Sequence, residues 1–148
     1  MTKNKIKIET VNIHGKEYVP VSERLKLAGD RIVAVETDVL RNDENEVMVK
    51  AKVVVLGEDK KKETAKVFSG HASSDKKSSG IEGQSSVEVA ETSAVGRALG
   101  FAGFGVINGI ASADEIIVAN NKSNSTSSAN KCPMCNAVSG HKPGCPNA

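Results

Sequence analysis

Alternation of apolar and polar residues predicts three strands in the middle of the chain. Valine or alanine stands at every second position of residues 47–55, and the segment 31–40 alternates in the same way. A third alternating run covers residues 64–73, and polar turns at 41–46 and 57–63 separate the three runs. A period of two is typical of a strand with one buried face, so the sequence predicts an antiparallel three-stranded meander.

Three lysines fall on the face of this predicted meander that points away from the core. Lys50 and Lys52 alternate with the apolar residues of the second strand. In the third strand we predict that Ala65 and Val67 point inward, which places Lys66 outward. If the strands pair in register, the three lysines form a ladder across the outer face of the sheet.

A long helix with small side chains is predicted after the meander. Within residues 86–101 apolar positions recur at spacings of three and four, and Ser85 and Glu88 have the spacing of a capping box. The apolar stripe consists of Val87, Ala90, Ala94, Ala98 and Phe101. Alanine, serine or glycine stands at positions 90, 93, 94, 96, 98 and 100. We therefore expect a close approach to this backbone, by a sheet or by another chain.

Shorter elements are predicted around this core. A hairpin turns at His14 and Gly15, a short helix covers residues 20–29, and another short helix begins at Ser112 as its cap. The predicted fold class is α+β, with an antiparallel curved sheet formed by the hairpin and the meander and packed by the long helix. A small zinc-binding tail completes it.

The zinc-binding tail is predicted from four residues near the end of the chain. Cys132, Cys135, His141 and Cys145 have the spacing C-x2-C-x5-H-x3-C. Three thiolates and one imidazole complete a tetrahedron without an open position for water, so we expect a structural Zn²⁺ site. A redox pair and a tail without metal are the alternatives. The predicted parts of the chain are a core at 1–119, a flexible linker at 120–130 and a zinc knuckle-like module at 131–148.

Charge and composition restrict how the protein could bind nucleic acid. The net charge is +2, but three lysines and no acidic residue follow position 119, so residues 1–119 carry a net charge of −1. Any nucleic-acid binding would need a local cluster of lysines. Aromatic residues make up 3% of the chain and tryptophan is absent, so few rings could stack on unpaired bases.

Several classes of protein are disfavoured by the same sequence. We recognise no catalytic triad, phosphate-binding glycine loop or open metal site, and so expect no enzyme. No apolar run reaches the roughly 18 residues needed to cross a bilayer, and the first residues do not resemble a signal peptide. We expect a soluble, cytoplasmic protein without a membrane partner.

The order of these elements resembles the phage single-strand annealing proteins of the Erf and Sak type, whose fold is similar to the annealing recombinase of the Rad group. The resemblance covers roughly residues 10–118 and rests on GKEYVPVSERLKLAG, VMVKAKVVV and VEVAETSAVGRALGFAGFG. It implies assembly into rings or filaments, with DNA in a basic groove between the sheet and the helical side. Arg97 matches the arginine that precedes Ala-Leu in this family.

On this resemblance we expect a protein that binds single-stranded DNA and promotes strand annealing in phage-type homologous recombination, in the cytoplasm of a bacterial host. The expected DNA-binding residues are Lys50, Lys52, Lys66, Lys76, Lys77 and Arg97. Expected partners are single-stranded DNA, further copies of the chain, and recombination or replication proteins contacted through the tail. Two alternatives remain open: an OB-type single-strand-binding protein, whose barrel would need five strands, and a zinc-tailed interaction protein without a DNA role.

Overall fold

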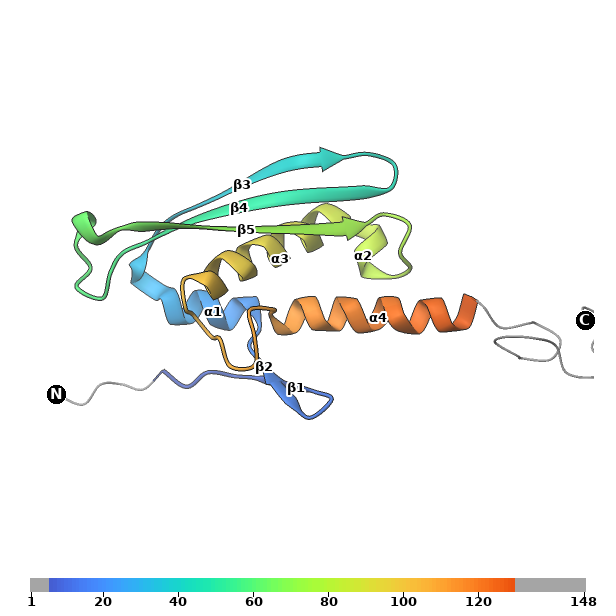
Figure 1. Cartoon of the computed structure of the whole chain (residues 1–148), viewed down its shortest axis with the longest axis horizontal. Helices are drawn as coiled ribbons and strands as arrows, with labels where there is room; N and C mark the ends of the chain where they lie inside the picture. The colour runs from blue at the N-terminus through green and yellow to red at the C-terminus, as the bar shows by residue number, and fades with distance from the viewer. Residues whose placement is uncertain (1–5, 130–148) are drawn as a thin grey trace, which may run out of the picture.

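The computed structural model describes residues 6–129, with side chains through residue 123. Its elements are β1 (Val11–Ile13), β2 (Lys16–Tyr18), α1 (Val21–Ala28), η1 (Gly29–Arg31), β3 (Ile32–Asn42), β4 (Glu46–Val55), η2 (Lys62–Thr64), β5 (Lys66–Asp75), α2 (Ile81–Gln84), α3 (Ser86–Phe101) and α4 (Ala113–Ala129). The three-stranded sheet forms one layer, and α3 crosses beneath it (Figure 1). Helices α1 and α4 and the hairpin β1–β2 lie on the other side of α3.

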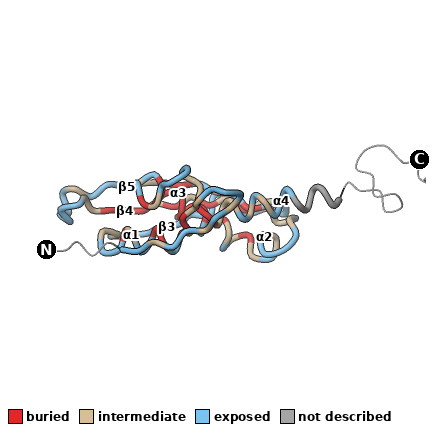
Figure 2. Tube along the Cα trace, turned by 90° about the horizontal axis from the view of Figure 1, so that it is seen from below, coloured by how far each residue is buried: buried red, intermediate tan, exposed pale blue. Residues whose placement is uncertain are grey.

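The core lies between β4 and α3. β4 is the central strand and pairs antiparallel with β3 and β5. Every second residue of β4 is buried, and on α3 the alanines Ala90, Ala94 and Ala98 are completely buried (Figure 2). The predicted α+β fold, with a meander packed by a small-residue helix, is confirmed.

We expected the hairpin and the meander to form one sheet, but the hairpin forms a two-stranded sheet of its own. Its turn is where the sequence predicts it, since His14 and Gly15 have φ angles of 51° and 81°. Helix α1 follows the hairpin and packs against α3 before the chain enters β3, so the two sheets lie on opposite sides of α3. The described residues therefore do not form the five-stranded barrel that an OB-type protein needs.

Gly70 explains why α3 has small side chains. This glycine of β5 lies opposite Ala51, on the sheet face that α3 covers. A Cβ atom at this position would lie 2.2 Å from the carbonyl oxygen of Ala94 and 2.6 Å from the backbone nitrogen of Ala98. The helix backbone thus lies directly on the strand backbone, and the predicted close approach is made by the sheet.

The start of α3 differs from the sequence prediction. The side chain of Ser85 makes no capping hydrogen bond, so the expected box with Glu88 is not formed. The short helix α2, in a segment that reads as a polar loop, leads directly into α3, and the backbone N–H of Ser85 donates to Ile81. At the other end of the expected apolar stripe, Phe101 is 51% exposed.

Helix α4 begins at the predicted cap and continues further than expected. Ser112 Oγ accepts from the N–H of Glu115 at 3.3 Å, and Glu115 Oε2 accepts from the N–H of Ser112 at 2.8 Å, a complete capping box. The helix then continues through Ala129, so residues 120–129, which we expect to be part of a linker, are helical. Once a helix is nucleated each further residue adds a hydrogen bond, which offsets the weak helix propensity of serine and asparagine. None of the described helices is long and apolar enough to cross a membrane.

Arg24 is a completely buried cation that the apolar pattern of α1 does not reveal. Its Nη1 donates to the carbonyl oxygens of Gly96 at 2.6 Å and Ile110 at 2.7 Å, and its Nη2 donates to Ala111 at 3.2 Å. Burial lowers the pKa of Arg24, and the charge of the nearby Glu115 opposes that shift. One side chain thus joins α1 to α3 and to the loop before α4.

The edge strand β3 extends beyond the cover of α3. Its apolar side chains Val33, Val35, Val39 and Leu40 are 43–59% exposed, although Val35 and Val39 lie opposite buried valines of β4. The side chain of Thr37 donates to Glu91 of α3 at 2.5 Å. The expected homo-oligomer stays a prediction. The uncovered edge strand β3 is a surface at which another copy of the chain could pair.

Candidate functional site

The outer face of the sheet carries Lys50 and Lys52 in rows of mixed charge. Directly opposed residues of antiparallel strands point to the same face. From β3 across β4 to β5, the two rows are Asp38, Lys50, His71 and Glu36, Lys52, Ser69. Each lysine therefore has a carboxylate on one side and a neutral or weakly basic side chain on the other, and the face is not a purely basic surface.

Lys66 does not belong to the lysine ladder, and this part of the sequence prediction is wrong. It lies opposite Val55, which is buried, so it is on the helix-covered side at the end of the sheet. The alternation of β5 is shifted by one residue from our expectation because Phe68 packs against the core, while Val67 is 62% exposed. Burying the phenyl ring removes more apolar surface from water than burying valine.

Lys66 lines a cavity of about 460 Å³ at this end of the sheet. Arg31 also lines it, and its guanidinium lies 5.1 Å from the centre of the Phe104 ring while its Nε donates to Leu56. Lys66 and Arg31 thus form a second basic position, separated from the outer face by the sheet.

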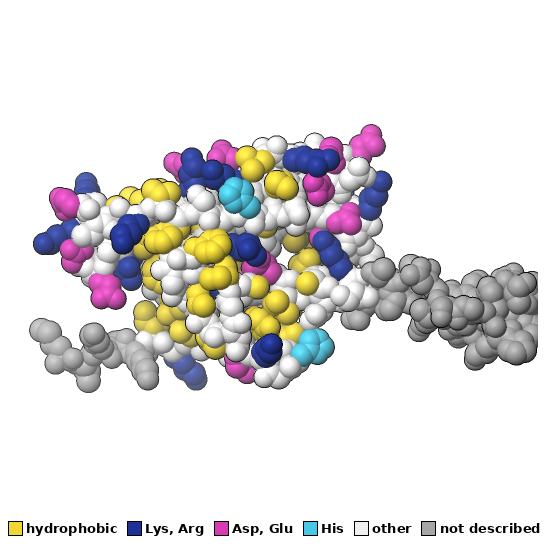
Figure 3. Space-filling model, in the orientation of Figure 1, with side chains coloured by type: hydrophobic (Ala, Val, Ile, Leu, Met, Phe, Trp, Pro, Cys, Tyr) yellow, Lys and Arg dark blue, Asp and Glu magenta, His cyan; other side chains and the backbone are white. Residues whose placement is uncertain are grey.

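Lys76 and Lys77 lie at the opposite end of the sheet, in the turn after β5. Lys76 contacts the side chain of Asn42, and its backbone N–H donates to Asn45 at 2.8 Å. The turn beside it is acidic, and there backbone N–H groups of Glu46 and Asn45 lower the pKa of Asp43 to about 2. On the face shown in Figure 3, basic and acidic side chains are interspersed.

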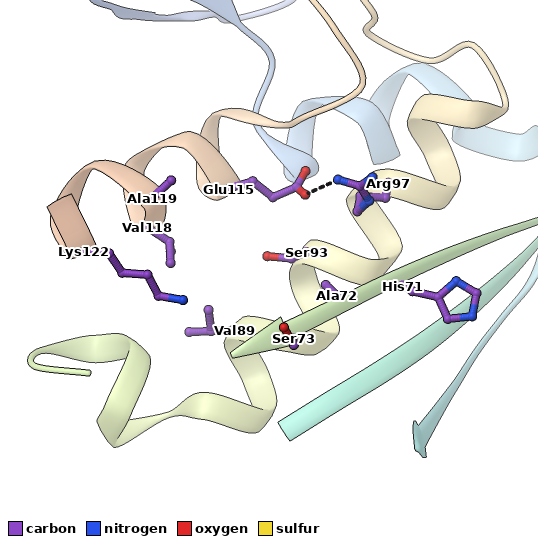
Figure 4. A pocket seen from close by; sticks show the side chains of 10 residues that line it. All are labelled: His71, Ala72, Ser73, Val89, Ser93, Arg97, Glu115, Val118, Ala119 and Lys122. Atoms are coloured by element: carbon purple, nitrogen blue, oxygen red, sulfur yellow. Dashed lines mark hydrogen bonds and ion pairs between the residues drawn. The ribbon is translucent and has the colours of Figure 1, made fainter. Parts of the chain in front are cut away.

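Arg97 lies in a cleft between β5, α3 and α4 that is about 260 Å³ in volume (Figure 4). Its Nη1 is 3.2 Å from Glu115 Oε1 of α4. The sequence suggests Glu88, Glu91 or another subunit as partner, and the structure instead pairs it with a residue 18 positions later. Ser93 of α3 and Lys122 of α4 point into the same cleft.

Lys122 forms the second ion pair at this cleft. Its Nζ lies 2.8 Å from Glu82 Oε1 of α2, and the Glu82 side chain is 5% exposed. Burial opposes ionisation of Glu82, but Lys122, the N–H of Asp75 and Ser78 together hold the pKa of this carboxyl below its usual value. The sequence analysis does not identify Ser93, Lys122 or Glu82, because only the tertiary structure brings them together.

The six predicted DNA-binding residues are thus distributed over four positions. Lys50 and Lys52 are on the outer face, Lys66 and the pair Lys76 and Lys77 are at opposite ends of the sheet, and Arg97 is in the cleft. The predicted zinc ligands Cys132, Cys135, His141 and Cys145 lie outside the described residues. Between residues 6 and 129 the structure brings no three metal-binding side chains together.

Comparison with known proteins concerns the sheet and α3. A family model described as Slr1353 N-terminal dsRNA-binding domain-like matches residues 32–102, just under half of the chain. The matched segment begins with β3 and ends one residue after α3. No curated protein and no solved structure matches the chain. Over this segment the chain is therefore similar to a dsRNA-binding domain-like family, and its assignment to the single-strand annealing proteins is wrong.

Proposed function

We propose that this protein binds nucleic acid through the phosphate backbone, with duplex RNA as its preferred form. The observation that carries the proposal is the match of a dsRNA-binding domain-like family to the sheet and α3. Duplex RNA is recognised mostly by its shape and by contacts to phosphates and 2′-hydroxyls, which require no stacking on aromatic rings. This agrees with a sheet whose outer face carries lysine, carboxylate, serine and histidine side chains but no phenylalanine, tyrosine or tryptophan.

Two groups of side chains offer phosphate contacts in this proposal. On the outer face, Lys50 and Lys52 are two residues apart on one strand, so both extend from the same side of β4. In the cleft, Arg97 presents a planar guanidinium that can hold two phosphate oxygens at once. The mixed charge of the surface predicts modest affinity at physiological salt, because few phosphates are neutralised at any one time.

The test is a comparison of four ligands of equal length and sequence: duplex RNA, duplex DNA, single-stranded RNA and single-stranded DNA. We expect the full-length protein to bind duplex RNA with the lowest dissociation constant in a fluorescence anisotropy titration. Tighter binding to single-stranded DNA would make the duplex proposal wrong. If the anisotropy changes are weak, equal for all four ligands and independent of salt, the protein does not bind nucleic acid and the whole proposal is wrong.

Replacing Lys50 and Lys52 together by glutamine is expected to weaken binding to every sequence tested. Both charges are lost from the phosphate-facing side, so the slope of log affinity against log salt should decrease by roughly one to two. The matched control replaces Lys7 and Lys16, two exposed lysines that precede α1, and should leave that slope unchanged. If the Lys50 and Lys52 variant keeps the parent's slope, the outer face does not contact phosphates.

For the C-terminal tail we propose one structural zinc ion, held by Cys132, Cys135, His141 and Cys145. The support is the spacing of three thiolates and one imidazole. We expect about one equivalent of zinc per chain by elemental analysis of protein purified without chelator. Cys135→Ser should release the metal and leave the thermal unfolding of the sheet and α3 unchanged. Less than half an equivalent in the parent would contradict the site.

A further inference from the structure

Helix α4 covers the cleft without packing into it. From Ile116 to Ser123 no described side chain of this helix is buried. The residues of α4 that line the cleft are Glu115, Val118, Ala119 and Lys122, and a volume of about 260 Å³ separates them from β5 and α3. A helix with few buried apolar contacts belongs to the least stable part of a fold.

The N-terminal end of α4 is held much more firmly than the rest. Ser112 and Ala113 are buried, and Asp114 Oδ2 accepts from the backbone N–H of Val21 at 2.8 Å, so this end is fixed to α1. Beyond it, the side chain of Lys122 pairs with Glu82. The helix therefore has a fixed N-terminal end, at which it can pivot, and the ion pair of Lys122 holds it in place near its middle.

Glu115 connects the fixed end of α4 to the cation of the cleft. Its Oε2 accepts the N–H of Ser112 within the capping box, and its Oε1 pairs with Arg97. The Glu115 carboxylate therefore occupies one side of the Arg97 guanidinium, and a phosphate group could contact that side if the carboxylate were absent. Lys122, the other cation of the cleft, is likewise paired with a carboxylate. Both cations are thus engaged within the protein while α4 covers the cleft.

We propose that α4 is a displaceable cover that inhibits nucleic-acid binding at this cleft, with Glu115 as the residue that competes with phosphate for Arg97. The inference rests on the proposed function and adds its regulation. Arg97 is already partly exposed, and when α4 moves away from β5 its guanidinium and the hydroxyl of Ser93 become more accessible to a phosphate group. The Arg97 side chain of the Arg97–Glu115 pair is 38% exposed, and ion pairs with an exposed partner are weakened by salt, so a phosphate group can replace the Glu115 carboxylate.

The variant Glu115→Gln tests the competition directly. Glutamine can still accept the N–H of Ser112, so the capping box is retained, but the charge beside Arg97 is lost. At low ionic strength we expect the full-length variant to bind a 20-base-pair RNA duplex on the order of threefold to tenfold more tightly than the parent. The matched control is Glu91→Gln, which removes one charge from α3 and can keep the hydrogen bond to Thr37. It should change affinity by less than about twofold.

A double variant shows whether the gain acts through Arg97. Arg97→Gln alone should bind more weakly than the parent, and adding Glu115→Gln to it should bring no further gain. An equal gain with and without Arg97 would mean that Glu115 acts by general charge repulsion and would overturn the proposal.

Hydrogen exchange of the α4 backbone separates this inference from the proposed function. In the absence of RNA, the amides of residues 116–123 should exchange faster in Glu115→Gln than in the parent or in Glu91→Gln. Duplex RNA should also speed their exchange in the parent. If the parent binds RNA but Glu115→Gln neither binds more tightly nor exchanges faster, the proposal that α4 is an inhibitory cover is wrong and the proposed function stands. If neither protein binds any nucleic acid, both are overturned.

Discussion

Gly70→Ala is expected to lower the free energy of unfolding by about 3 kcal/mol, although it adds only one methyl group. The new Cβ atom would lie 2.2 Å from the carbonyl oxygen of Ala94 and 2.6 Å from the nitrogen of Ala98. Both are backbone atoms of α3, so no side-chain rotation can relieve the contact, and the helix must move away from β5. That movement would open the packing of α3 on β4 along the whole core.

The measurement is urea unfolding followed by circular dichroism, with Ser69→Ala as control. Ser69 neighbours Gly70 but lies on the outer face opposite Lys52, so its replacement should change stability by less than about 0.5 kcal/mol. A glycine to alanine change that causes no clash stabilises a protein by about 0.4–1 kcal/mol through the unfolded state. A stabilised Gly70→Ala protein would therefore show that α3 does not lie on the strand backbone.

Arg24→Met should destabilise the protein by about 3–5 kcal/mol, because several carbonyl oxygens lose a buried donor and each unsatisfied buried acceptor costs about 1–3 kcal/mol. Methionine fills much of the space of the arginine stem but leaves the carbonyl oxygens of Gly96, Ile110 and Ala111 without their donor. Because two of these carbonyls lie in the loop between α3 and α4, we also expect rapid hydrogen exchange throughout residues 102–112.

Arg24→Lys distinguishes hydrogen-bond geometry from charge in this prediction. Lysine keeps the positive charge, but its ammonium group has no planar fork to reach α3 and the loop together. We expect it to recover less than half of the stability lost in Arg24→Met, as measured by urea unfolding. Full recovery would show that the charge alone holds the loop, through Glu115 and Asp114.

The fold could be predicted from the sequence wherever a pattern is local. The alternation of β4, the turn at His14 and Gly15, and the cap at Ser112 each depend on neighbouring residues, and each is found in the structure. The faces of β5 were predicted wrongly because its small residues alternate weakly, and Gly70 gives no signal that a helix backbone lies against it. Arg24 could not be predicted, since its acceptors lie at least 72 positions away.

The candidate site could be predicted only in part, for a similar reason. The sequence predicts a role in binding for Arg97 and the lysines of β4, but it does not predict the acidic residues that the structure places beside them. The sequence predicts Ser112 as the cap of α4, but not that one carboxylate oxygen of Glu115 completes the capping box. The other oxygen pairs with Arg97 because α4 turns back across α3, which depends on the whole tertiary structure.

The long-range hydrogen bonds of Arg24 also limit the order in which the parts of the fold can form during synthesis. The strands β3, β4 and β5 follow one another in the sequence and each pairs with the next, so they can pair soon after they leave the ribosome. Ile110 follows Arg24 by 86 residues, roughly 4 to 17 seconds at ordinary rates of translation. Until then the guanidinium keeps its hydration shell, because no carbonyl cage exists to replace it. We therefore expect α1, although it is synthesised first, to dock after the sheet and α3 have formed.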